Sequence, residues 1–323
     1  MADKDTDSQS TEKPARKKTA RAKKEAASSV DLREPASILD KIKPSSSDDE
    51  ITASVEERIT ALQKHYGLEK YHVLLLFDDE DEITAWHSNR LYSAASSSSE
   101  KPILLLVNSL GGQIEPAYLI SKTCKRLSDG GFVVAVPRKA KSAATLICLG
   151  ASAIHMGQMS ELGPIDPQLN GLPALGMQNA LQVLSDLSCK YPGAGDMLSS
   201  YLKEKLDLRI LGYFDRIAES AVQYAERLLA GKSFADGFDA TKLADHFVNH
   251  YKDHGFVIDA DEAEKYLGND VIKVGTQEYQ FANSVYELTD FLAFVLPRVF
   301  KKQFDFVGGT GDFRLFPLRK EDD

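Results

Sequence analysis

The sequence predicts an α/β protein with a largely parallel β-sheet core, flanking helices and a disordered N-terminal tail. Short apolar runs, typical of strands buried on both faces, alternate with helix-like segments from residue 73 onward. The first 50 residues are instead rich in Lys, Ala, Ser and Asp, and they bury too little apolar surface to offset the entropy of ordering. We therefore expect a tail at 1–50, a domain at 51–275 and a helical, glycine- and aromatic-rich extension at 276–323.

The elements of the domain follow one another in order. Val55, Ile59 and Leu62 recur at helical spacing, so the domain opens with a helix that ends near Gly67. Buried strands are expected at 73–77, 103–109, 132–137 and 153–156. Helices are expected between and after them, near 83–95, 115–127, 143–150, 174–189, 196–205, 208–229 and 284–295. The segment 254–268 pairs a short strand with a helix. Strands separated by helices in this way favour a parallel sheet.

Composition excludes several classes of function. The net charge is -9, and the basic residues concentrate only at Lys13–Lys24, so nucleic acid is not expected as the main partner. We interpret that run as solvated chain. The three cysteines are widely spaced and odd in number, which favours a reducing compartment without a disulfide framework. With no secretory signal and no membrane span, the sequence predicts a cytoplasmic protein.

Two glycine- and serine-containing turns carry the chemistry. Asn108–Gly112 follows a strand and precedes a helix, where adjacent glycines can aim backbone N–H groups at an oxyanion. Ser142 lies between a strand and an apolar helix, followed only by small residues, so the helix dipole favours a nucleophile there and Ala143 can donate a second N–H. Each turn alone has a simpler interpretation: the glycines form an ordinary turn, and Ser142 is a helix N-cap.

The order and spacing of these motifs resemble a known family. The series NSLGG, KSAATLICLGA and SELGPIDPQ over residues 70–268 is similar to ClpP and to signal peptide peptidase A, and more closely to the SDH-type Clp-fold serine proteinases of the ClpP/crotonase superfamily. This resemblance implies a serine protease or peptidase with Ser142 as nucleophile and Gly111, Gly112 and Ala143 at the oxyanion positions. It also implies a homo-oligomer that acts on peptides or unfolded proteins.

The sequence departs from ClpP at the position of the general base. Where ClpP has its histidine, this chain has Asp166, and near the position of the ClpP acid it has His254. A triad of Ser142, His254 and Asp166 satisfies the chemistry in either chain order. A serine–lysine dyad is the alternative, with Lys141 or Lys190 as the base and Lys203 and Lys205 also available.

Other functions remain open. His246, His250 and His254 share i, i+4 spacing, but no acidic partner pattern accompanies them, so we expect no metal. No lysine lies in a pyridoxal-phosphate motif, and we expect no cofactor. A crotonase-type acyl-CoA enzyme shares the fold and the oxyanion hole but does not need Ser142. A non-catalytic scaffold, binding partners through the N-terminal arm and the aromatic C-terminal segment, is the third alternative.

Overall fold

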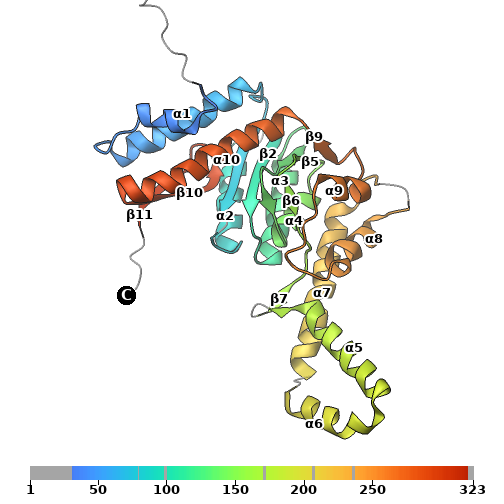
Figure 1. Cartoon of the computed structure of the whole chain (residues 1–323). Coiled ribbons are helices and arrows are strands. Elements are labelled where there is room, and N and C mark those ends of the chain that lie inside the picture. Colours follow the sequence, from blue (N-terminus) through green and yellow to red (C-terminus); the bar gives the residue numbers. More distant parts are fainter. Residues whose placement is uncertain are drawn as a thin grey trace, which may run out of the picture. The chain divides into compact units, whose positions relative to one another are not determined.

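The computed structural model describes residues 31–318 apart from 79, 98–99, 170–171, 206–207 and 235–236. Its core is a mixed sheet with helices on both faces (Figure 1). The strands run in the order β11-β10-β1-β2-β3-β5-β9, and β4 and β6 extend the sheet beside β2. The predicted α/β class with flanking helices is therefore confirmed.

The central strands are β1 (His72–Asp78), β2 (Ile103–Ser109), β3 (Phe132–Ala135), β5 (Ala153–Met156) and β9 (Ile272–Val274). They pair in parallel, with Leu74 opposite Leu105 and Leu105 opposite Val134. Successive side chains along each strand point to opposite faces of the sheet, as the two-residue period of a strand requires. Leu74, Leu105 and Val107 join one apolar cluster, whereas Leu75, Leu104 and Leu106 join the other. Burial on both faces explains the continuous apolar runs of the sequence.

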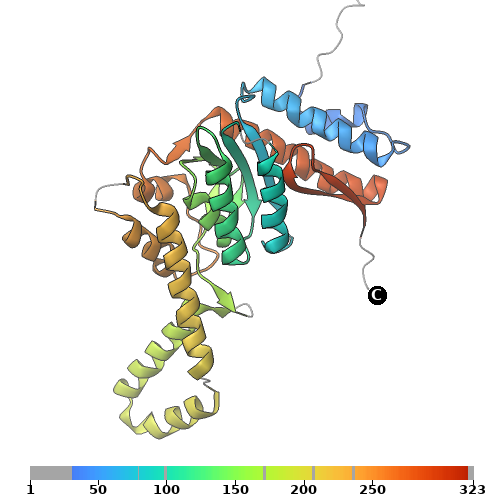
Figure 2. The same ribbon diagram turned by 180° about the vertical axis from the view of Figure 1, so that it is seen from behind.

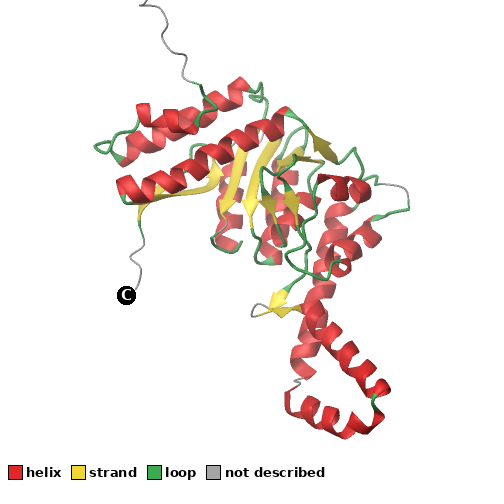
Figure 3. Ribbon diagram, viewed as in Figure 1, coloured by secondary structure: helices red, strands yellow, loops and turns green. Residues whose placement is uncertain are grey.

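Helices cover both faces. On one face lie α2 (Ala85–Ser96), α3 (Ile114–Leu127) and α4 (Ala143–Leu149), and on the other α1 (Asp48–His65) and α10 (Gln277–Val295) (Figure 3). Helix α7 (Leu208–Leu229) packs against α3 and α4, and α8 (Ala240–Asp245) packs against α7. Helix α9 (Ala260–Leu267) precedes β9. Among the described helices, none combines the length and apolar composition that crossing a bilayer requires.

Two expected boundaries were wrong. Residues 1–30 lie outside the described residues, but Pro35–Asp40 forms a 3-10 helix, and Ile38 and Ile42 are buried in the α1–α10 cluster. The expected tail at 1–50 therefore ends too late in the sequence, because Ile38 and Ile42 bury their side chains in the cluster with α1 and α10. The extension at 276–323 also belongs to the main fold: β10 (Lys302–Gly309) pairs antiparallel with β1, and β11 (Arg314–Pro317) pairs with β10. Helix α10 begins at Gln277 because the Thr276 hydroxyl caps it.

Between β6 and β9 the chain runs outside the central sheet. The short strands β4 (Lys139–Ala140) and β6 (Glu161–Leu162) pair with each other, and β7 (Gln168–Leu169) and β8 (Leu172–Pro173) form a small hairpin. Helices α5 (Ala174–Lys190) and α6 (Gly195–Lys205) lie beyond that hairpin, and both views show them away from the sheet (Figures 1 and 2). Helix α7 leads the chain back to α3 and α4.

Candidate active site

Ser142 occupies the junction between β4 and α4 in a strained backbone conformation. Its φ is 50° and its ψ is -120°, in a region that residues with a side chain rarely adopt. The Ser142 hydroxyl makes no capping hydrogen bond to α4, so the interpretation of Ser142 as an ordinary side-chain cap does not describe this structure. Strain of this kind persists only where the surroundings impose it, and such positions cluster at functional sites.

The glycine turn imposes that geometry by packing directly against Ser142. Gly111 has φ 104°, and a Cβ added there would lie 2.8 Å from the Ser142 Cβ and 2.7 Å from the Lys141 carbonyl oxygen. Gly112 has φ 147°, and its Cβ would lie 2.2 Å from the Ile83 nitrogen. Neither position has room for a side chain. Both glycines are therefore required by close backbone approach as well as by positive φ.

The N–H groups around Ser142 differ in availability. The Gly111 N–H donates to the buried Ser109 hydroxyl at 3.1 Å. The N–H groups of Gly112 and Ala143 donate no hydrogen bond to any described residue, as expected for Ala143 at the first position of α4. An oxyanion hole needs donors that are not already engaged. The geometry thus favours Gly112 and Ala143 over Gly111 among the three residues expected there.

A cavity of about 800 Å³ opens at this turn. Ser142, Gly111, Gly112, Lys141 and His254 all line it. The structure therefore brings the expected nucleophile, the glycine turn and the expected base to one cavity, although Ser142 and His254 are 112 positions apart in sequence.

His254 and Asp166 approach each other at the edge of this cavity. His254 Nδ1 lies 4.0 Å from Asp166 Oδ2, and the two side chains are 28% and 5% exposed. Burial lowers the pKa of His254 below its usual 6.5, and the Lys141 ammonium lowers it further, while Asp253 and a hydrogen bond to the Asp166 backbone raise it. A neutral imidazole is the form that accepts a proton from a serine.

Lys141 is engaged elsewhere. Its ammonium lies 2.8 Å from the Glu161 carboxylate and donates to the carbonyl oxygens of Leu162 and Phe256. Its aliphatic stem fills the space beside Gly163, where an added Cβ would lie 2.6 Å from the Lys141 Cδ. The Lys141 ammonium thus spends its hydrogen bonds on Glu161 and on two backbone carbonyls. Lys141 therefore braces the nucleophile turn against the two loops that carry Asp166 and His254.

The other predicted bases and ligands lie apart. Lys190 is the exposed last residue of α5 and is not among the residues that line the cavity. The expected histidine ladder was wrong, because a π-helix of His246–His250 ends before Tyr251 and His254 follows in a loop. In the described part of the chain, no group of three His, Cys, Asp or Glu side chains is arranged to hold a metal ion.

Sequence reasoning missed two parts of the site. The Thr145 hydroxyl lies 2.6 Å from the Ala140 carbonyl oxygen and 2.8 Å from that of Gly163, to either of which it can donate, and it accepts from the Gly163 N–H at 3.0 Å, so it ties α4 to the loop that leads to Asp166. A threonine in the first turn of an apolar helix is a signal for such a bond. Helix α7 supplies a cavity wall through Tyr213, Arg216, Ile217 and Ser220. No local pattern distinguishes that wall from an ordinary amphipathic helix.

A comparison with known proteins finds a family match for part of the chain. Residues 71–187 match the family model of ClpP-like SDH-type serine proteinases. Over 117 residues the chain is 32% identical to an uncharacterized protein, MJ0137, of Methanocaldococcus jannaschii; the match covers 36% of this chain and 38% of that protein. The chain thus aligns with well under half the length of this curated relative.

Solved structures show distant likeness. A serine-to-alanine variant of the membrane-bound stomatin-specific protease 1510-N has a TM-score of 0.39 at 15% identity, covering 69% of this chain and 84% of that chain. A variant of the same protease in complex with a substrate peptide has 0.38 at 19%, covering 63% and 74%. A ClpP1 variant from Listeria monocytogenes has 0.36 at 16%, covering 68% and 99%. The segment that carries Ser142 and the glycine turn, residues 71–187, thus matches the ClpP-like SDH-type serine proteinases.

Proposed function

We propose that the protein is a serine peptidase that cleaves peptide bonds through an acyl-enzyme on Ser142. The observation that carries this proposal is the strained Ser142 turn: a positive φ holds an uncapped hydroxyl at a cavity that His254 also lines. A serine becomes nucleophilic when a neighbouring base removes its proton. The match of residues 71–187 to a serine proteinase family supports the same reaction.

In this mechanism His254 accepts the Ser142 proton as the hydroxyl attacks the scissile carbonyl. Asp166 lies behind His254 and stabilises the imidazolium that forms. The Gly112 and Ala143 N–H groups receive the oxyanion. The proton then passes to the leaving amine, and water hydrolyses the ester by the same route. The 4.0 Å separation of His254 and Asp166 closes to a hydrogen bond when substrate is bound.

The substrate is a peptide or an unfolded protein segment, and the active protein is a homo-oligomer. A crotonase-type reaction needs the paired N–H groups but no nucleophile, whereas here the strained residue is the one that carries a hydroxyl. A scaffold needs neither group. Covalent chemistry at Ser142 therefore separates the three alternatives.

The test is labelling with a fluorophosphonate probe, followed by peptide mapping. We expect one labelled site, Ser142, and complete loss of labelling in Ser142→Ala. Ser220→Ala is the matched control, because Ser220 lines the same cavity from α7. It should label at the wild-type rate. Labelling that survives Ser142→Ala, or no labelling of a folded wild type, contradicts the proposal.

A further inference from the structure

A second cavity, of about 990 Å³, opens beside the catalytic one at the carboxyl ends of β1 and β2. Asn108 lines this second cavity, whereas Leu110, two residues further along the chain, lines the catalytic cavity. Glu80, Asp81 and Glu82, in the loop after β1, line both. A peptide that lies across Ser142 is therefore separated from the second cavity by a single loop.

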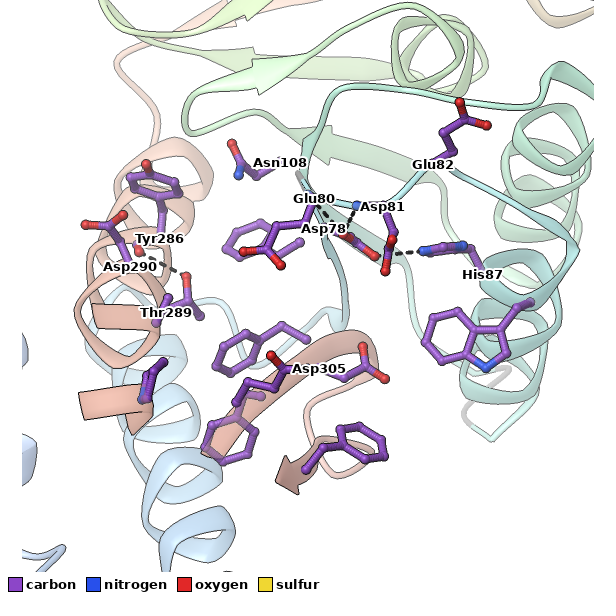
Figure 4. Close-up of a pocket in the computed structure, with 18 of the residues that line it drawn as sticks. Asp78, Glu80, Asp81, Glu82, His87, Asn108, Tyr286, Thr289, Asp290 and Asp305 are labelled. Atoms are coloured by element: carbon purple, nitrogen blue, oxygen red, sulfur yellow. Dashed lines mark hydrogen bonds and ion pairs between the residues drawn. The ribbon is translucent and has the colours of Figure 1, made fainter. Parts of the chain in front are cut away.

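Carboxylates outnumber basic side chains in the walls of the second cavity, although the Arg90 guanidinium lies nearby, over the Trp86 ring. The carboxylates of this cavity are Asp78, Glu80, Asp81, Glu82, Asp290 and Asp305, and no Lys or Arg lines it among the described residues. His87 pairs with Asp78 at 3.0 Å. Figure 4 shows Asp78, Glu80 and Asp305 around one space between α10 and α2.

The Asp305 carboxylate lies near Arg90, but one of its oxygens makes no hydrogen bond to a described residue. That oxygen, Oδ2, is buried. The nearby Arg90 guanidinium donates to the carbonyl oxygens of Val307 and Asp312. Burial raises the pKa of Asp305, and the Arg90 charge lowers it. A buried carboxylate oxygen without a hydrogen-bond donor is costly, and a bound cation removes that cost.

Aromatic side chains complete the lining. They are Phe77, Trp86, Tyr286, Phe304, Phe306 and Phe316. The faces of aromatic rings attract cations, tryptophan most strongly. Carboxylates beside aromatic faces suit a side chain with an apolar stem and a cationic head, which is the chemistry of lysine and arginine.

The second cavity joins two parts of the chain. Helix α10 contributes Tyr286 and Asp290, β10 contributes Asp305, and β11 contributes Phe316. These four lie beyond residues 71–187, the segment that matches the family model, whereas the acidic loop after β1 and Trp86 lie within it. The cavity therefore forms only where the C-terminal segment closes over the end of β1.

We propose that the second cavity binds a lysine or arginine side chain of the peptide whose backbone lies across Ser142. The protein then prefers substrates with a cationic residue near the scissile bond. The nature of the ligand as a peptide rests on the function proposed above, whereas the preference for a cation rests on the cavity itself.

Trp86 provides a direct readout, because it is the only tryptophan of the sequence and lines this cavity. In the Ser142→Ala protein, tryptophan fluorescence is followed during titration with a tryptophan-free peptide that carries one arginine. The comparison peptide carries citrulline, which keeps the shape of arginine without its charge. We expect the arginine peptide to change Trp86 fluorescence and to bind about tenfold tighter or more.

Substitutions in the second cavity then test whether its carboxylates cause the preference for arginine. The double substitution Glu80→Gln with Asp305→Asn is made in the same Ser142→Ala background. It should reduce the ratio of the two affinities, arginine peptide over citrulline peptide, to about twofold or less. Asp290→Asn is a second variant at an exposed position, and it should lower the ratio by itself. Glu264→Gln is the matched control, since Glu264 is exposed on α9 and lines neither cavity. Glu264→Gln should keep the affinity ratio of the Ser142→Ala protein.

The outcomes separate this inference from the proposed function. Equal binding of the two peptides, or an unchanged ratio in both the double variant and Asp290→Asn, overturns the inference. Fluorophosphonate labelling of wild-type Ser142 is measured in parallel. Labelling without an arginine preference removes the inference and leaves the peptidase, whereas an arginine preference without labelling removes the peptidase and leaves the binding cavity.

Discussion

The nucleophile side and the base side of the catalytic cavity are held together differently. Around Ser142, backbone packs on backbone so closely that no side chain fits at Gly111 or Gly112. Around His254, the imidazole is 28% exposed and lies 4.0 Å from the Asp166 carboxylate. The proposed nucleophile is thus held by steric exclusion, while the proposed base is held by a longer polar contact. The following predictions test that contrast.

The largest effect is expected from His254→Gln. If His254 is the base, the fluorophosphonate labelling rate should fall about 1,000-fold, with little change in the free energy of unfolding. In the wild type, the rate should fall as the pH drops through a midpoint below 6.5, because burial favours the neutral, active imidazole. The labelling rate is measured from about pH 4.5 to about 10.5, and urea denaturation gives the free energy of unfolding. A profile that rises only above about pH 9 instead indicates a lysine base.

Gly112→Ala should damage the nucleophile side most. The new Cβ meets the Ile83 backbone at 2.2 Å, and backbone cannot move aside as a flexible side chain can. We expect a loss of about 3 kcal/mol or more in the free energy of unfolding, measured with urea. Gly130→Ala is the control, because Gly130 also has positive φ, 84°, but nothing within 4 Å of the added Cβ. It should cost only about 1 kcal/mol. Equal losses would show that φ, and not close packing, limits this turn.

Lys141→Met tests the brace between the two sides. The change keeps most of the stem beside Gly163 but leaves the Glu161 carboxylate without its ammonium. We expect a loss of about 2 kcal/mol in unfolding free energy, below the range for a fully buried pair, because Glu161 is 27% exposed. Labelling of Ser142 should slow but persist. Complete loss of labelling with unchanged stability would instead assign Lys141 as the base.

The smallest effect is expected from Thr145→Val, which removes the hydroxyl while keeping the shape. The Thr145 hydroxyl bonds Ala140 and Gly163, so its loss should cost about 1 to 2 kcal/mol of unfolding free energy. The labelling rate should fall by less than about tenfold, because Gly112 still packs against Ile83. Thr289→Val, on α10, is the control for the substitution itself. A larger rate effect for Thr145→Val than for His254→Gln would reverse the proposed contrast.

Local pattern predicted the strands around the Ser142 turn well. The apolar runs that were expected as strands became β1, β2, β3 and β5 with nearly the same bounds, because a strand buried on both faces leaves a continuous apolar signature. The adjacent glycines marked a turn, but Ser142 was chosen as the nucleophile through a family resemblance, and that role remains a prediction. The contrast in availability between the Gly111 and Gly112 N–H groups was not visible, since it depends on the orientation of the Ser109 hydroxyl.

Local pattern identified the base side less well. His254 and Asp166 were chosen through a family resemblance and remain a prediction, although they lie near each other. The three-histidine ladder was wrong because a π-helix ends before Tyr251, and helical periodicity carries no signal for that change. The engagement of Lys141 by Glu161 was equally invisible, since the two residues meet only when β4 pairs with β6.

The sequence by itself determined the alternation of buried strands and helices and the glycine turn after β2. Each of these arises from steric and hydrophobic constraints between residues close along the chain. Only the tertiary structure decided that the C-terminal segment pairs β10 with β1, and that Asp305 and Phe316 meet Trp86 at a second cavity. Those contacts join segments more than 200 positions apart, and they form because β1 offers an edge for β10, not because of any periodicity in the segments themselves.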